Sequence, residues 1–86
     1  MGLDTVELLI ELEEAYGISI PDEDAEGLGV LGDLARYIVA RLEGLGRNAD
    51  FEVVLRHIID ILVKNYGVPE GMANSQSHVV LDLGLE

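Results

Sequence analysis

Residues 3–16 read LDTVELLIELEEAY, and this stretch sorts its acidic and apolar side chains onto different sides of a predicted helix. At about 100° per residue, four acids spaced three or four residues apart fall within an arc of roughly 80°. They are Asp4, Glu7, Glu11 and Glu14, and we call them the acidic stripe. Apolar residues occupy most of the remaining circumference, so we expect the helix to be contacted from several sides. A cationic partner would explain the stripe, and an ordinary solvated face of an acidic protein is the alternative.

Length and composition predict one small globular domain. The chain has 86 residues, of which 49% are hydrophobic, so it can bury one modest core. Its longest apolar stretch is interrupted by charged residues, so no run of about 18 apolar residues predicts a membrane span. The N-terminal residues are not basic and there is no cysteine. We therefore expect a cytoplasmic protein without a secretory signal or disulfides.

The formal net charge of −12 is unevenly distributed. Residues 1–35 contain no lysine or arginine, and the basic residues are Arg36, Arg41, Arg47, Arg56 and Lys64. One part of the fold should therefore carry a strongly negative field. Nucleic acid is not an expected partner, because neutralising phosphates needs clustered basic residues. Basic protein surfaces are expected partners.

Two further long helices are predicted by apolar residues at helical spacing. The first covers about 13 residues from Val30 to Leu42, and the second follows a plausible N-cap at Asp50 and is closed by Gly67. Residues 43–49 have two glycines and no periodicity, which is typical of a flexible connection.

Glycine and proline mark the remaining boundaries. Gly17 is placed to end the first helix in a left-handed conformation, and residues 18–21 then read as an extended segment. Asp22 is expected to cap a short turn that continues through Glu26. Residues 68–86 form an unusually long connection, and such segments are commonly functional or disordered.

An acidic segment partly matches a calcium-binding loop. Positions 1, 3, 5, 6 and 12 of that loop would be filled by Asp22, Asp24, Glu26, Gly27 and Asp33. Position 12 lacks the bidentate glutamate, and an extended segment precedes position 1 in place of a helix. We therefore expect no structured metal site, with Asp22, Asp24 and Glu26 as weak candidates for adventitious divalent-cation binding.

No motif in the chain predicts catalysis. His57 and His78 have no second histidine or cysteine at metal-ligand spacing. No serine lies in a G-x-S-x-G turn, and glycine-rich phosphate-binding loops are absent. The chain is therefore not expected to be an enzyme.

Residues 3–42 resemble the second half of an acyl carrier protein. Members of that family show a D-S-L-D-T-V-E-L phrase that opens a helix, followed by E-E-x-x-x-I-x-I-P-D-E-D-A-E and a final helix. This chain carries LDTVELLIELEEAYGISIPDEDAE and then VLGDLARYIVARL. The resemblance implies a small three-to-four-helix bundle that carries an acyl chain for fatty-acid or polyketide synthesis.

The remaining segments resemble the same family in the wrong order. FEVVLRHIIDILVKNYGV at 51–68 is similar to its first helix, and HVVLDLGLE at 78–86 is similar to the F-x-x-D-L-G-x-D end of its first loop. Joining Glu86 to Met1 restores the family phrase across the two ends. We therefore expect a circularly permuted domain, with the family's second half at 1–42, a connector at 43–50 and the first half at 51–86.

The family's attachment serine is missing. That serine, just before the L-D-T-V-E-L phrase, carries 4′-phosphopantetheine, whereas Gly2 stands there in this chain. Without a hydroxyl at position 2 nothing can be esterified, and Thr5, one turn inside the helix, is a poor substitute. No cofactor is therefore expected on this chain.

Two functions from different classes remain open. The first is a carrier domain that acyl-chain-processing enzymes and a phosphopantetheinyl transferase recognise through the acidic stripe. The second is a structural or interaction module of the same fold, including a permuted chain made to test folding. Calcium binding by an acidic protein is a weaker alternative.

Two structural expectations follow. Phe51, Leu55, Ile58 and Leu62 should face a set of apolar residues on the other long helices, namely Val6, Leu9, Ile10, Leu34 and Ile38. Val79, Val80 and Leu83 should return to the bundle, so that residues 85–86 end beside residues 1–2. The connector reaches roughly 15 Å, so the chain could close as a monomer or exchange halves in a domain-swapped dimer.

Overall fold

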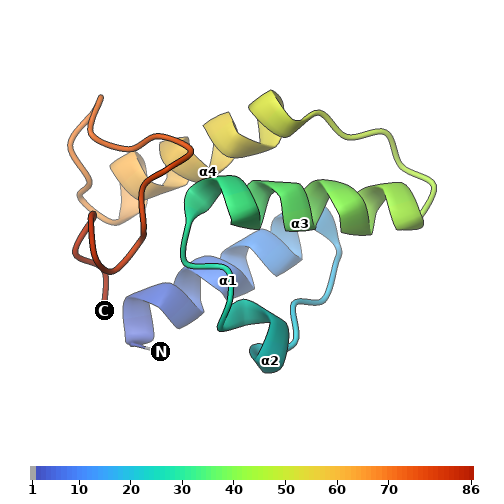
Figure 1. The fold of residues 1–86 in the computed structure, drawn as a ribbon, viewed down its shortest axis with the longest axis horizontal. Coiled ribbons are helices and arrows are strands. Elements are labelled where there is room, and N and C mark those ends of the chain that lie inside the picture. The colour runs from blue at the N-terminus through green and yellow to red at the C-terminus, as the bar shows by residue number, and fades with distance from the viewer. Residues whose placement is uncertain (1) are drawn as a thin grey trace.

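Three long helices and one short helix are present in the computed structural model, which describes residues 2–86. They are α1 (Leu3–Tyr16), α2 (Asp22–Ala25), α3 (Leu31–Gly44) and α4 (Phe51–Asn65). Helices α3 and α4 lie side by side, and α1 crosses beneath them (Figure 1). The short helix α2 lies within the connection from α1 to α3. Within residues 2–86 the only strand-like pairing is an isolated antiparallel bridge between Val30 and His78. The predicted all-α bundle is confirmed.

Local signals place most helix ends correctly. Gly17 ends α1 with φ 65°, and Gly67 has φ 72° just after α4. The Asp50 side chain caps α4 by accepting from the Val53 N–H at 3.1 Å. The prediction for Asp22 was wrong, because Pro21 occupies the N-cap position and Asp22 is the first residue of α2, without a side-chain capping bond.

The core lies where α1, α3 and α4 meet. Its most completely buried side chains are Leu8, Leu12, Leu31, Leu34, Ile38, Ile58 and Leu62. Of the predicted core, Leu9 and Leu55 are also buried, while Val6 and Phe51 are half-buried. Ile10 was predicted wrongly, since it is 47% exposed. Ile10 precedes Glu14 by four residues, so these two side chains lie on the same side of α1.

Only one side of α1 is buried. Its buried residues are Thr5, Leu8, Leu9 and Leu12, which recur at i, i+3, i+4 and i+7. The expectation that this helix would be contacted from several sides is therefore wrong. The additional apolar residues Leu3 and Ile10 are exposed.

The long C-terminal segment, residues 68–86, provides the caps of two helices. Neither Gly2 before α1 nor Val30 before α3 makes a side-chain capping bond. Carbonyl oxygens of the C-terminal segment accept from the free N–H groups at these helix starts instead. The pairs are Thr5 N to Glu86 O at 2.7 Å, Leu31 N to Ser77 O at 2.9 Å and Gly32 N to Ser75 O at 2.8 Å. The long irregular segment thus satisfies backbone donors at the starts of two helices.

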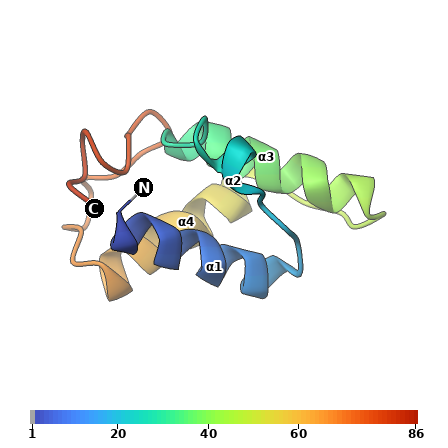
Figure 2. The ribbon, with the colours of Figure 1, turned by 90° about the horizontal axis from the view of Figure 1, so that it is seen from below.

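The two ends of the described chain lie side by side (Figures 1 and 2). Val79 and Leu85 are buried and Leu83 is half-buried, so the segment does return to the bundle. Val80 was predicted wrongly because it is 44% exposed. Residues 85–86 do end beside Gly2, whereas Met1 lies outside the described residues.

The connection from α3 to α4 is short and ordered by backbone hydrogen bonds. Glu43 and Gly44 are the last residues of α3, so the irregular part is shorter than predicted. Gly46 has φ 78°, and the Arg47 N–H donates to the Leu42 carbonyl at 2.9 Å. The Arg47 guanidinium also donates to the Tyr16 carbonyl at the end of α1. These bonds hold the connection against the α1–α2 loop.

Candidate functional site

Position 2 has neither a hydroxyl nor free space. Gly2 is the N-cap of α1, with φ −77° and ψ 171°, a conformation that any residue can adopt. A Cβ atom at this position would overlap the carbonyl carbon of Glu86. A larger side chain at position 2 therefore requires the Glu86 backbone to move.

The Glu86 carbonyl continues the helical hydrogen-bond register of α1. The Val6 N–H donates to the Gly2 carbonyl at 3.1 Å, which is the i to i−4 bond of a helix. The next acceptor in this register belongs to the residue before Gly2, and the Glu86 oxygen fills its position opposite the Thr5 N–H. The Thr5 hydroxyl donates to the same oxygen at 2.9 Å and Thr5 is buried. Its hydroxyl is therefore engaged in holding the two ends together.

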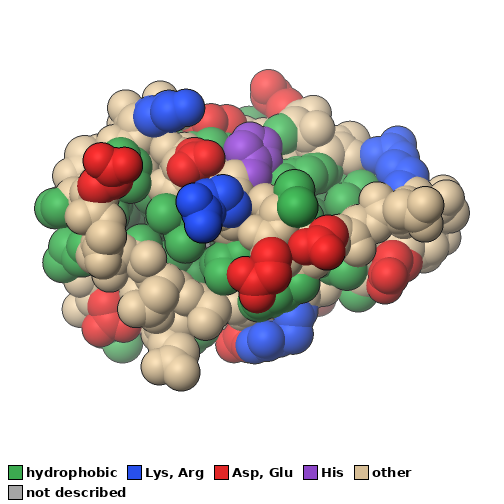
Figure 3. Space-filling model, turned by 90° about the horizontal axis from the view of Figure 1, so that it is seen from above, with side chains coloured by type: hydrophobic (Ala, Val, Ile, Leu, Met, Phe, Trp, Pro, Cys, Tyr) green, Lys and Arg blue, Asp and Glu red, His purple; other side chains and the backbone are tan. Residues whose placement is uncertain are grey.

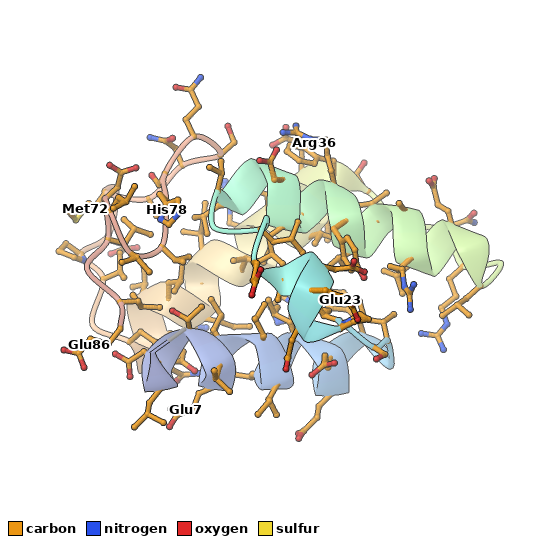
Figure 4. The ribbon with its side chains drawn as sticks, turned by 60° about the horizontal axis from the view of Figure 1, so that its bottom comes forward. Glu7, Glu23, Arg36, Met72, His78 and Glu86 are labelled. Atoms are coloured by element: carbon orange, nitrogen blue, oxygen red, sulfur yellow. The ribbon has the colours of Figure 1, made fainter. Side chains whose placement is uncertain are left out.

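The acidic stripe runs along the outer side of α1. Glu7 and Glu14 are exposed, whereas Asp4 and Glu11 are half-buried. Figure 4 shows Glu7 on the side of α1 away from the other helices. The Glu11 carboxylate accepts from the Asn65 amide of α4 at 3.1 Å, so this acid is partly occupied.

The charge of the acidic stripe is not neutralised by nearby basic groups. Within residues 2–86, the one ion pair within 4 Å joins Arg36 to Asp33 on α3, at 2.8 Å.

Tyr66 lies beside the acidic stripe. Burial raises the pKa of its hydroxyl, and the carboxylates of Glu11, Glu7 and Asp4 raise it further.

The basic side chains form no continuous patch on the face shown in Figure 3. Lysine and arginine side chains are dispersed there among acidic and apolar ones. On this face the basic side chains therefore offer no counterpart to the row of acids on α1.

A small apolar hollow of about 90 Å³ lies one turn from Gly2. It is formed by α1, the α2–α3 connection and residues 78–80, with walls that include Leu8, Leu9, Leu34 and Val79. Its ionisable lining residues are Glu26 and His78. We did not predict this hollow, because its walls come from segments that are distant in the sequence.

The three weak metal candidates do not form a ligand set. The Asp24 carboxylate accepts from the Tyr37 hydroxyl at 2.7 Å, and Asp33 pairs with Arg36. No group of three histidine or acidic residues within 2–86 is arranged to hold a metal ion. His57 is engaged elsewhere, with its Nδ1 2.7 Å from the Tyr16 hydroxyl.

No helix in the described part of the chain is long and apolar enough to cross a membrane.

Comparison with known proteins finds matches to the first half of the chain. Residues 3–38, which cover α1, α2 and much of α3, match the family described as phosphopantetheine attachment site. An acyl carrier protein of Prochlorococcus marinus (strain MIT 9515) is 56% identical over 40 residues, which are 46% of this chain and 50% of the relative. The chain thus spans about half the length of this curated relative. No solved structure matches the chain significantly.

Proposed function

We propose that the whole chain is a circularly permuted domain of the acyl carrier protein family, whose members are non-catalytic carriers. The support is that residues 3–38 match the phosphopantetheine attachment site family and that 40 residues are 56% identical to an acyl carrier protein. In this proposal residues 1–42 are the second half of the family domain, 43–50 are a connector and 51–86 are the first half. Its acidic helix α1 is the surface that acyl-chain-processing enzymes recognise.

The hydrogen bond between Thr5 and Glu86 carries the proposal of permutation. Glu86 supplies the carbonyl that a residue directly before Gly2 would supply in an unbroken helix. This arrangement is what a parent chain continuous from residue 86 into residue 2 would leave behind. The closed α3–α4 connection supports the same proposal, because permutation needs a connector that spans the former ends.

The residues at the start of α1 do not fit the family's prosthetic group. A helix N-terminus favours a phosphodiester through its free N–H groups and dipole. Position 2 has no hydroxyl to esterify, the Glu86 backbone takes the space of a side chain, and the Thr5 hydroxyl is bonded to Glu86. We therefore propose that this chain carries no 4′-phosphopantetheine and acts, through its acidic stripe, as a protein-binding module of the carrier fold.

Binding to a phosphopantetheinyl transferase, which the family resemblance suggests as a partner, tests the role of the acidic stripe. The variant Glu7→Lys/Glu14→Lys reverses two exposed charges and should weaken binding by roughly tenfold at low salt. Added salt should weaken binding of the unmodified chain in the same direction, because exposed charges are screened.

The matched control is Glu52→Lys/Asp60→Lys, which reverses two exposed acids on α4 and so changes the net charge by the same amount. It should leave the affinity nearly unchanged in a calorimetric titration. Affinity that responds neither to reversal of Glu7 and Glu14 nor to salt would show that the stripe is only a solvated face.

A further inference from the structure

We propose that His78 is a pH-sensitive cap: the neutral imidazole holds residues 78–83, of which 78–80 form part of the wall of the apolar hollow, in place against the bundle, and protonation of the ring loosens them. We call residues 78–83 the cover. Val79 and Val80, within the cover, line the hollow next to α1. The proposal concerns the fold of this chain and needs neither cargo nor a protein partner.

The His78 ring caps the turn formed by the cover. Its Nδ1 atom accepts from the Val80 N–H at 3.1 Å and from the Leu81 N–H at 3.2 Å. In return, the backbone N–H of His78 donates to the Asp82 carboxylate at 2.7 Å. This reciprocal pattern is similar to the capping box of a helix start. Because Nδ1 is an acceptor, the neutral ring carries its proton on Nε2.

The same ring fixes the cover to the rest of the fold. A Cβ atom on Gly29 would overlap the imidazole, so the ring lies directly against this backbone. The Val79 N–H donates to the Gly29 carbonyl at 2.9 Å, and Val30 and His78 form the isolated bridge. Figure 4 shows His78 in the C-terminal segment, near the start of α3. A change in the ring position therefore acts on both the cover and the α2–α3 connection.

Protonation removes the cap. An imidazolium has two N–H donors and no acceptor, so the Val80 and Leu81 N–H groups lose their partner. Histidine changes charge between about pH 5 and 8. Two acidic residues lie in this region: Asp82, whose carboxylate accepts from the backbone N–H of His78, and Glu26, which lines the same hollow as His78. The hollow-lining residues from α1 and α3 are uncharged.

Amide hydrogen exchange measured by NMR tests this inference. Val79 and Leu85 report on the cover, because the Leu85 N–H donates to the Val79 carbonyl at 2.9 Å. Their protection factors, corrected for intrinsic exchange, should fall by about fivefold between pH 7.5 and 5.5, as expected for the loss of one cap. Protection of the buried Ile58 in α4 should stay constant over this range.

Three variants separate capping from other effects of pH. His78→Asn keeps an acceptor that cannot titrate, so its protection should not fall, whereas His78→Ala should show low protection at both pH values. His57→Gln removes the other histidine and should keep the response of the unmodified chain. Equal protection at both pH values in the unmodified chain, or the same fall in His78→Asn, would overturn the proposal. A proton on Nδ1 at pH 7.5, seen in the ring 15N shifts of the unmodified chain, would also overturn it.

Discussion

Replacing Gly32 by alanine tests whether the C-terminal segment caps α3 as closely as the structure shows. Gly32 is the second residue of α3, and alanine is favoured over glycine inside a helix by about 1 kcal/mol. Helix propensity alone therefore predicts stabilisation. In the structure, however, an added Cβ would lie 2.8 Å from the Ser75 carbonyl oxygen, which also accepts the Gly32 N–H at 2.8 Å.

The geometry predicts destabilisation. A backbone carbonyl cannot rotate away as a side chain can, so the segment must shift and the hydrogen bond is weakened or lost. Losing the bond costs about 1 kcal/mol and the forced displacement about 1–3 kcal/mol. After subtracting the gain in propensity, Gly32→Ala should lower the free energy of unfolding by about 1–3 kcal/mol.

Urea unfolding followed by far-UV circular dichroism measures this difference, and Gly44→Ala is the matched control. Gly44 is the last residue of the same helix and has no atom within 4 Å of an added Cβ, so alanine there should be neutral or stabilising by up to about 1 kcal/mol. If Gly32→Ala were as stable as Gly44→Ala, the close contact between α3 and Ser75 would be refuted.

Three further predictions concern the core, the junction of the ends and the half-buried Tyr66. Leu55→Ala and Ile58→Ala should each lower the free energy of unfolding by about 2–5 kcal/mol, whereas Val53→Ala, at a residue that is 66% exposed, should change it by less than about 0.5 kcal/mol in the same urea assay. Thr5→Val removes the hydroxyl that donates to Glu86 and should cost about 1 kcal/mol; no loss would show that this bond does not hold the ends together. Burial raises the pKa of the Tyr66 hydroxyl, and the nearby carboxylates of Glu11, Glu7 and Asp4 raise it further. The protonated hydroxyl therefore contributes stability that is fully present below about pH 10 and is lost as the pH rises through the raised pKa. Absorbance at 295 nm should show tyrosine ionising at higher pH in the folded chain than in urea, and the opposite order would contradict this assignment.

Local sequence signals predicted the helices well because their causes are local. The left-handed glycine after α1 and the Asp50 cap before α4 depend on neighbouring residues alone, and the structure confirms both. The family resemblance of residues 3–38 is also confirmed. Ile10 was assigned to the core because apolar character alone does not reveal which side of α1 meets α4.

The features of the candidate site depend on contacts between distant segments. The hollow needs α1, the α2–α3 connection and the cover to meet. The sequence gives no reason for a glycine at position 32, because the reason is the Ser75 carbonyl that packs against it in the fold. The capping role of His78 likewise depends on how its ring lies against Gly29. The permuted order, the loss of the prosthetic group and the acidic stripe as a docking surface remain predictions.

Intact-mass spectrometry after incubation with coenzyme A and a phosphopantetheinyl transferase tests most directly whether this chain can be loaded with 4′-phosphopantetheine. An unpermuted acyl carrier protein in the same reaction confirms that the enzyme is active. Because Gly2 offers no hydroxyl and the Thr5 hydroxyl is buried and bonded to Glu86, the mass of this chain should remain unchanged while the control gains one prosthetic group. A gain of one phosphopantetheine by this chain would contradict the proposal that it cannot be loaded.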